Sequence, residues 1–178
     1  MALAAAGSVI GEPLYDAETI ARRVTELGAE ITRDYDGKEP LFVGLRNAAK
    51  TFLPDLLAAV CIPCSSTVIS LTDYLHGEEA RLECESPIPI SGRHVIVVDD
   101  TVDTGLTLHS VMKTLQRRSP ASLAVCALLD RRHRRIADID IKYRGFEAPD
   151  VFVVGYGLEY LGRYRELPAL YAHGTWPA

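Results

Sequence analysis

One stretch of the chain, VIVVDDTVDTGLTL at residues 95–108, constrains the fold more than any other. Four apolar residues lead directly into three aspartates, several threonines and a glycine. A short apolar run that ends in turn-forming residues is typical of a buried strand in an α/β protein. In open parallel sheets, ligands bind at the carboxyl ends of strands, and Asp99 and Asp100 lie at such an end. The stretch therefore predicts a strand that ends in a binding site.

Strands and helices alternate along the chain from residue 41 to residue 130. This order predicts an α/β fold, with a parallel sheet flanked by helices and right-handed crossovers between strands. The last fifty residues break the alternation and predict a small cap beside the sheet. Strands are expected at 41–45, 65–71, 94–100 and 122–130, and helices at 16–35, 48–60 and 107–118.

Length and composition favour one domain in a cytoplasmic protein. The chain has 178 residues, 48% of them hydrophobic, and a net charge of −5, which argues against a nucleic-acid-binding surface. No apolar run approaches the roughly 18 residues that cross a bilayer, so no membrane association is expected. Within the single domain of residues 1–178 we expect a loose tail at 1–13, a polar loop at about 72–92 and a cap from about 137–178.

Two sequence features allow more than one interpretation. Cys61 and Cys64 form a CxxC pair, which is found in redox and zinc sites, but no second pair accompanies it, so a simple turn is favoured. The run DRRHRR at 130–135 is either a solvated basic turn or part of a binding site.

The glycine turn at 103–105 precedes a predicted helix and indicates an anion site. The first amides of a helix carry free N–H groups and a partial positive charge, which suit a phosphate. Asp99 and Asp100 should point to opposite sides of the strand. Carboxylates beside a phosphate site suit ribose hydroxyls and Mg²⁺. The alternative is a capping turn in which Asp103 or Thr104 caps the helix.

The same stretch resembles the 5-phosphoribosyl-1-pyrophosphate (PRPP) signature of type I phosphoribosyltransferases, and in particular of hypoxanthine-guanine phosphoribosyltransferases. Residues 26–45, 121–130 and 145–168 are similar to that family in the same order, while 63–91 match weakly. The resemblance implies a five-stranded parallel core with a flexible flap at about 72–92 and a small hood at about 137–178. It also implies Mg²⁺, PRPP and a purine base as ligands, and a dimer or tetramer.

The resemblance assigns a role to each candidate site residue. Asp103 is implied as the general base, and Asp99, Asp100 and Glu159 as residues that reach the metal. Arg131, Phe152, Val153 and Glu159 are implied to bind the purine base, with Phe152 stacking on it unless it is a core residue. The implied PRPP contacts are Arg46, Asn47, Asp99, Asp100, Asp103, Thr104, Gly105, Leu106, Thr107 and Arg165.

Four positions depart from the family pattern. Arg46-Asn47 replace Lys-Gly in the pyrophosphate loop, and Arg131 replaces the lysine that donates to the purine 6-oxo group. The flap lacks its Ser-Tyr pair, which leaves Tyr74 as a possible substitute. Glu159 replaces an aspartate. Transfer of phosphoribose to hypoxanthine or guanine is therefore expected, with two alternatives: transfer to a modified base such as a 7-deazapurine, or a non-catalytic regulator that senses PRPP or a nucleotide.

Overall fold

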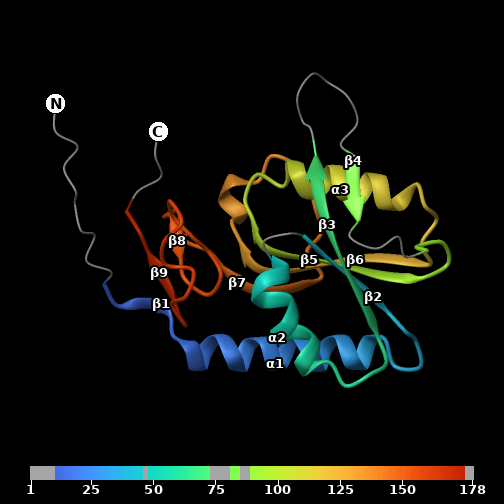
Figure 1. The fold of residues 1–178 in the computed structure, drawn as a ribbon, viewed down its shortest axis with the longest axis horizontal. Coiled ribbons are helices and arrows are strands. Elements are labelled where there is room, and N and C mark those ends of the chain that lie inside the picture. The colour runs from blue at the N-terminus through green and yellow to red at the C-terminus, as the bar shows by residue number, and fades with distance from the viewer. Residues whose placement is uncertain (1–10, 46–47, 73–80, 85–88, 175–178) are drawn as a thin grey trace.

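The computed structural model describes residues 11–45, 48–72, 81–84 and 89–174 (Figure 1). The main sheet has six strands in the order β4-β3-β2-β5-β6-β7. The strands β3, β2, β5, β6 and β7 run parallel to one another, whereas β4 is antiparallel to β3. The predicted parallel α/β core is therefore confirmed. Its strands are β2 (Leu41–Leu45), β3 (Ser65–Thr72), β4 (Arg81–Cys84), β5 (His94–Val102), β6 (Ser122–Asp130) and β7 (Tyr143–Glu147).

Helices cover both faces of this sheet (Figure 1). On one face α1 (Ala17–Asp34) and α2 (Phe52–Ala59) pack residues such as Leu27 and Phe52 against Phe42 of β2. On the other face α3 (Leu106–Gln116) packs Leu108 and Val111 against Val43 of the same strand. Since both faces are covered, β2 and the inner part of β5 are continuously apolar and do not alternate.

The predicted helix at 48–60 is wrong in one respect, because it is two elements. A 3-10 helix, Ala48–Lys50, is followed by α2, which begins at Phe52. Pro54 explains the break: it lies in the first turn of α2, where a residue without an N–H group is tolerated, and it would disrupt the interior of one long helix. The break places Thr51 next to the later glycine loop at Gly157.

The predicted boundaries of tail and hood also need correction. A second, three-stranded sheet has the order β1-β9-β8, formed by Pro13–Tyr15, Leu170–Ala172 and Val153–Val154. Pro13, which was expected in the loose tail, pairs with Tyr171. In contrast β7, which was expected in the hood, pairs in parallel with β6 in the main sheet. The small sheet thus joins segments from opposite ends of the chain.

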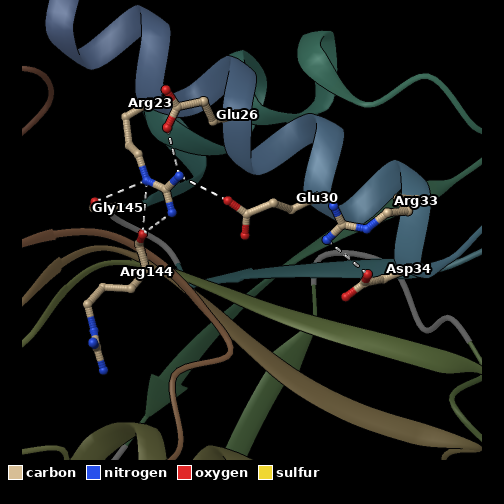
Figure 2. A network of polar contacts seen from close by, with 7 residues as sticks. All are labelled: Arg23, Glu26, Glu30, Arg33, Asp34, Arg144 and Gly145. Carbon is tan, nitrogen blue, oxygen red and sulfur yellow. Dashed lines mark hydrogen bonds and ion pairs between the residues drawn. The ribbon is translucent and has the colours of Figure 1, made fainter.

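The open edge of the main sheet at β7 is covered by an arginine from α1 (Figure 2). Arg23 donates from Nε and Nη2 to the carbonyl oxygen of Arg144, with the shorter contact at 2.7 Å, and from Nε to that of Gly145 at 3.2 Å. Glu26 and Glu30 accept from its Nη1 at 2.8 and 2.9 Å. Pairing these carbonyls with a charged side chain protects the edge from another strand.

Two expectations fall on parts of the chain that are only partly described. Of the expected flap at 72–92, β4 continues the sheet beside β3, whereas Tyr74 lies outside the described residues. Within the described ranges, no helix is both long and apolar enough to cross a membrane.

Candidate active site

The loop between β5 and α3 is shaped by Gly105. This residue is the N-cap of α3 with φ +80°, a left-handed conformation that glycine adopts easily. A Cβ at this position would lie 2.8 Å from Cδ of Arg135 and 3.2 Å from the carbonyl oxygen of Ala137. Leu106 and Thr107 follow as exposed residues in the first turn of α3. The expected phosphate loop is therefore a tight glycine turn into a helix N-terminus.

The capping alternative for this turn is wrong for Asp103. The N-cap residue is Gly105, and of the two proposed capping residues only Thr104 accepts a hydrogen bond from the start of α3, a long one of 3.5 Å from the N–H group of Leu106. Asp103 turns instead to Arg134, whose Nε donates to its Oδ1 at 2.8 Å. Gly105 thus leaves the start of α3 without a carboxylate cap, and the anion site expected at this turn stays a prediction.

Asp99 and Asp100 were expected on opposite sides of the strand, but their side chains hydrogen bond to each other. Both residues lie within β5, which continues to Val102; neighbouring side chains leave a strand in opposite directions at Cβ, but the two carboxyl groups still interact. Burial, and then the charge of Asp100, raises the pKa of Asp99 well above its usual value. Burial also raises the pKa of Asp100, against the hydrogen bond from Asp99 and the charge of Arg165.

A pocket of about 280 Å³ opens beside this strand end. Six of the predicted site residues line it: Asp100, Arg131, Phe152, Val153, Glu159 and Arg165. Asp99, Asp103 and the residues of the glycine turn are not among its lining residues, and Arg46 and Asn47 lie outside the described residues. The pocket therefore brings together the residues expected to bind the base, one acid of β5 and the expected pyrophosphate arginine.

Sequence reasoning missed three lining residues: Thr101, Gly157 and Leu158. Gly157 has φ +92°, and a Cβ there would lie 2.7 Å from Oγ1 of Thr51. Its signal was the GYG within GYGLEYLG, which fits no dinucleotide-binding motif. The glycines serve another purpose, since Gly155, Tyr156 and Gly157 all have positive φ and turn the chain sharply around the pocket.

Arg131 enters the pocket from the end of β6 and is only 2% exposed. Its Nη2 donates to the carbonyl oxygen of Val151 at 2.7 Å, and its backbone N–H donates to that of Val102 at 2.9 Å. Burial lowers the pKa of Arg131, although the charges of Asp103 and Asp150 oppose the shift. The guanidinium is thus fixed by the wall of the pocket, with its charge close to Asp103.

Phe152 is half-buried and belongs to an aromatic cluster that extends away from the pocket. Its ring meets Tyr160 edge-on with centroids 5.3 Å apart, and Tyr160 contacts His173 at 4.8 Å. The backbone N–H of His173 also donates to the carbonyl oxygen of Phe152 at 2.8 Å. No local pattern in the sequence indicates this cluster, because the spacing of its members follows neither a helix nor a strand.

Charge pairing organises the remaining site residues. Arg165 forms an ion pair with Glu159. In the basic run, Arg135 pairs with the buried Asp130 and Arg134 with Asp103, so the solvated-turn interpretation is wrong for these two arginines. Arg132 is exposed, as that interpretation expected.

The cysteine pair lies apart from this site. Cys61 and Cys64 are free, exposed thiols in the connection between α2 and β3. Burial raises the pKa of Cys64, which makes its reactive thiolate form less abundant.

Five parallel strands, a glycine turn into a helix and a pocket at the strand ends define the fold of a type I phosphoribosyltransferase. The chain belongs to the phosphoribosyl transferase domain family, whose model matches residues 11–161. It is 38% identical over 152 residues to a hypoxanthine phosphoribosyltransferase of Haemophilus influenzae, covering 82% of this chain and 85% of the relative. It is also 38% identical over 161 residues to a hypoxanthine-guanine phosphoribosyltransferase of Staphylococcus aureus, covering 88% and 90%.

Solved structures agree with this assignment. A hypoxanthine-guanine phosphoribosyltransferase of Bacillus anthracis superposes with a TM-score of 0.85 at 32% identity, covering 92% of this chain and 96% of that one. A hypoxanthine phosphoribosyltransferase of Staphylococcus aureus superposes with a TM-score of 0.84 at 37% identity, covering 96% of this chain and 97% of that one.

Proposed function

We propose that the protein transfers phosphoribose from PRPP to hypoxanthine or guanine, giving a nucleoside 5′-monophosphate and pyrophosphate. The observation that carries the proposal is the pocket that joins Asp100 of β5 to Arg131 and Phe152, beside a glycine turn suited to a phosphate. The names of the relatives support the choice of 6-oxopurines.

The glycine turn is assigned to the 5′-phosphate of PRPP. Its backbone N–H groups and the hydroxyls of Thr104 and Thr107 supply donors, and the positive end of α3 favours the charge. Asp99 and Asp100 are assigned to the ribose hydroxyls, which donate to carboxylates. Arg46 and Asn47 are assigned to pyrophosphate from the sequence alone. This arrangement directs the C1 carbon of the ribose toward the pocket.

In the transfer, a purine nitrogen bonds to C1 as the bond from C1 to the pyrophosphate oxygen breaks. Asp103 accepts the proton of that nitrogen through Oδ2, since Oδ1 is engaged by Arg134. Arg165 stabilises the negative charge that develops on pyrophosphate. The carboxylates of Asp99 and Asp100 favour the positive charge that develops on the ribose.

The base is assigned to the outer part of the pocket. Phe152 supplies an aromatic face, the backbone of Val153 meets the edge of the base, and Arg131 donates to its 6-oxo group. Glu159 lies on the same wall. Arginine is longer and planar compared with the lysine of the family, so a modified purine such as a 7-deazapurine stays an alternative.

Mg²⁺ fits the donor set of the site. Asp100 and Glu159 line the same pocket, and the carboxyl group of Asp99 interacts with that of Asp100. No group of three or more His, Cys, Asp or Glu that suits a metal was found among the described residues. One or two carboxylates together with substrate phosphates are the usual ligands of Mg²⁺. When bound, the ion neutralises charge on the leaving pyrophosphate.

Assembly and location are proposed from resemblance. We expect a homodimer or homotetramer, which light scattering of the purified protein tests. The expected cytoplasmic location stays a prediction.

A turnover assay tests the proposed function directly. The protein is incubated with Mg²⁺, PRPP and single bases, and pyrophosphate release is followed. Product from hypoxanthine or guanine supports the proposal. Product from a modified base alone supports the 7-deazapurine alternative, and tight PRPP binding without product supports the regulator.

Asp103→Asn tests the assigned base. We expect kcat to fall about 10²- to 10⁴-fold, the usual contribution of a general base, while the Kd for PRPP changes little. Asp138→Asn is the matched control, since Asp138 is exposed and outside the pocket lining. Equal losses of kcat and PRPP affinity in Asp103→Asn would contradict the role.

A further inference from the structure

The segment that follows β6 supports the loop that carries Asp103. The backbone N–H of Arg131 donates to the carbonyl oxygen of Val102 at 2.9 Å, directly before Asp103. The N–H groups of Ile136 and Ala137 both donate to the carbonyl oxygen of Thr104, at 2.9 and 3.0 Å, directly after it. The backbone on each side of Asp103 is thus tied to the same short segment.

One side chain of that segment, Arg134, contacts Asp103 itself. Its Nε donates to Oδ1 of Asp103 at 2.8 Å, and both side chains are about one third exposed, at 35% and 31%. Its Nη1 lies 3.7 Å from Oδ1 of Asp150, which also lies 3.2 Å from Nε2 of His133. The Asp103 contact is the shorter and better shielded of the two, because Asp150 is 66% exposed.

The same guanidinium contacts Asp103 on one side and, on the other, Asp150 of the segment that leads into the pocket wall. Asp150 precedes Val151, whose carbonyl oxygen accepts from Arg131, and Phe152 follows next in the chain. Arg134 therefore lies between Asp103, the residue assigned to the proton, and the segment before β8 that carries Phe152. Since a guanidinium is planar and rigid, it fixes the orientation of a carboxylate that it contacts.

We propose that Arg134 is a positioning residue: it holds Oδ1 of Asp103 so that Oδ2 faces the base that stacks on Phe152. The inference rests on the proposed function, and it assigns Arg134 no contact with PRPP or with the base. Errors of about 1 Å in the placement of a reacting group cost about 10²-fold in rate. Loss of Arg134 should therefore lower turnover and leave donor binding nearly intact.

The test is a double-mutant cycle between Arg134 and Asp103. Arg134→Gln should lower kcat with hypoxanthine about 10- to 100-fold, with a change of less than about threefold in the Kd for PRPP. In an Asp103→Asn background the same substitution should lower kcat by less than about threefold, since the group that it positions is gone. Arg132→Gln, in the same turn but exposed, is the matched control and should keep wild-type kcat.

A purely structural role predicts different results. If Arg134→Gln lowers kcat by the same factor with and without Asp103, or behaves like Arg132→Gln, the inference is overturned. Arg134→Lys keeps the charge without the planar contact, so its kcat should lie between those of the wild type and Arg134→Gln. If Arg134→Gln does not fold, Arg134→Lys replaces it in the double-mutant cycle. Wild-type protein that transfers to no base would overturn the proposed function and this inference with it. If the wild-type protein is active and the effects of Arg134→Gln and Asp103→Asn on kcat simply multiply, the inference about Arg134 is overturned and the proposed function is not.

Discussion

Gly28→Ala is a sharp test of the packing that holds α1 against α2. Gly28 lies in the interior of α1 and is buried. A Cβ at this position would lie 2.5 Å from both Cβ and the carbonyl oxygen of Ala59, and 2.7 Å from its carbonyl carbon. Carbon contacts are optimal at about 3.5–4.0 Å, so the two helices must separate by roughly 1 Å.

Two opposing terms set the size of the effect. Replacing a helical glycine by alanine stabilises a helix by about 1 kcal/mol. Overpacking costs about 1–3 kcal/mol, and contacts with a backbone that cannot rotate away favour the upper end. We therefore expect a net loss of about 2 kcal/mol in the free energy of unfolding, which corresponds to a fall in Tm of about 4–8 °C for a chain of this length.

Thermal and urea unfolding measure this change. Ala29→Gly is the matched control, because Ala29 is the exposed neighbour in the same helix and the exchange measures the propensity term alone. Ala29→Gly should lower the free energy of unfolding by about 1 kcal/mol. A Gly28→Ala protein with an unchanged or raised Tm would refute the reasoning, since propensity would then outweigh the contact with α2.

Two further predictions concern charge and the glycine turn. Contacts with Lys142 and Tyr143 hold the pKa of Asp34 in the folded protein below its usual value. The ionised Asp34 therefore stabilises the fold at any pH above its pKa in the unfolded chain, and this stabilisation is lost as the pH falls through its pKa in the folded protein. Asp34→Asn should therefore lower Tm at pH 7, by an amount that shrinks as pH falls below about 4, and a constant difference would contradict this. Gly105→Ala should weaken PRPP binding, measured by calorimetry, by more than tenfold. The left-handed conformation at φ +80° costs alanine about 1–2 kcal/mol, and the new Cβ would meet the side chain of Arg135. An unchanged affinity for PRPP would argue against a phosphate at this turn.

The elements that the sequence predicted well are those that depend on local pattern. The bounds of β2 and β6 were predicted to the residue, because each is an apolar run between turn signals. The hood was misjudged because the pairing of Pro13 with Tyr171 joins opposite ends of the chain, which no local pattern encodes. Likewise β7 mixes tyrosine, arginine and glycine, and its place at the sheet edge follows from pairing with β6.

The same division applies to the site. The glycine turn and the acids at the end of β5 were visible as one contiguous motif, and the pocket does contain Asp100. The ion pair of Asp103 with Arg134 was not visible, because the four arginines of the run at 131–135 carry no indication of which one turns inward. The contact of Asp99 with Asp100 was also missed, since strand alternation predicts side-chain direction at Cβ and not where flexible carboxylates end.

The small sheet has a consequence for the order in which the protein matures on the ribosome. Val153 pairs with Ala172, and Pro13 pairs with Tyr171, so both outer strands wait for a central strand that is translated after them. The layers around β5 involve earlier residues and are able to assemble first. A nascent chain halted before β9 would therefore carry the glycine turn while the wall that bears Val153 still lacked its partner strand.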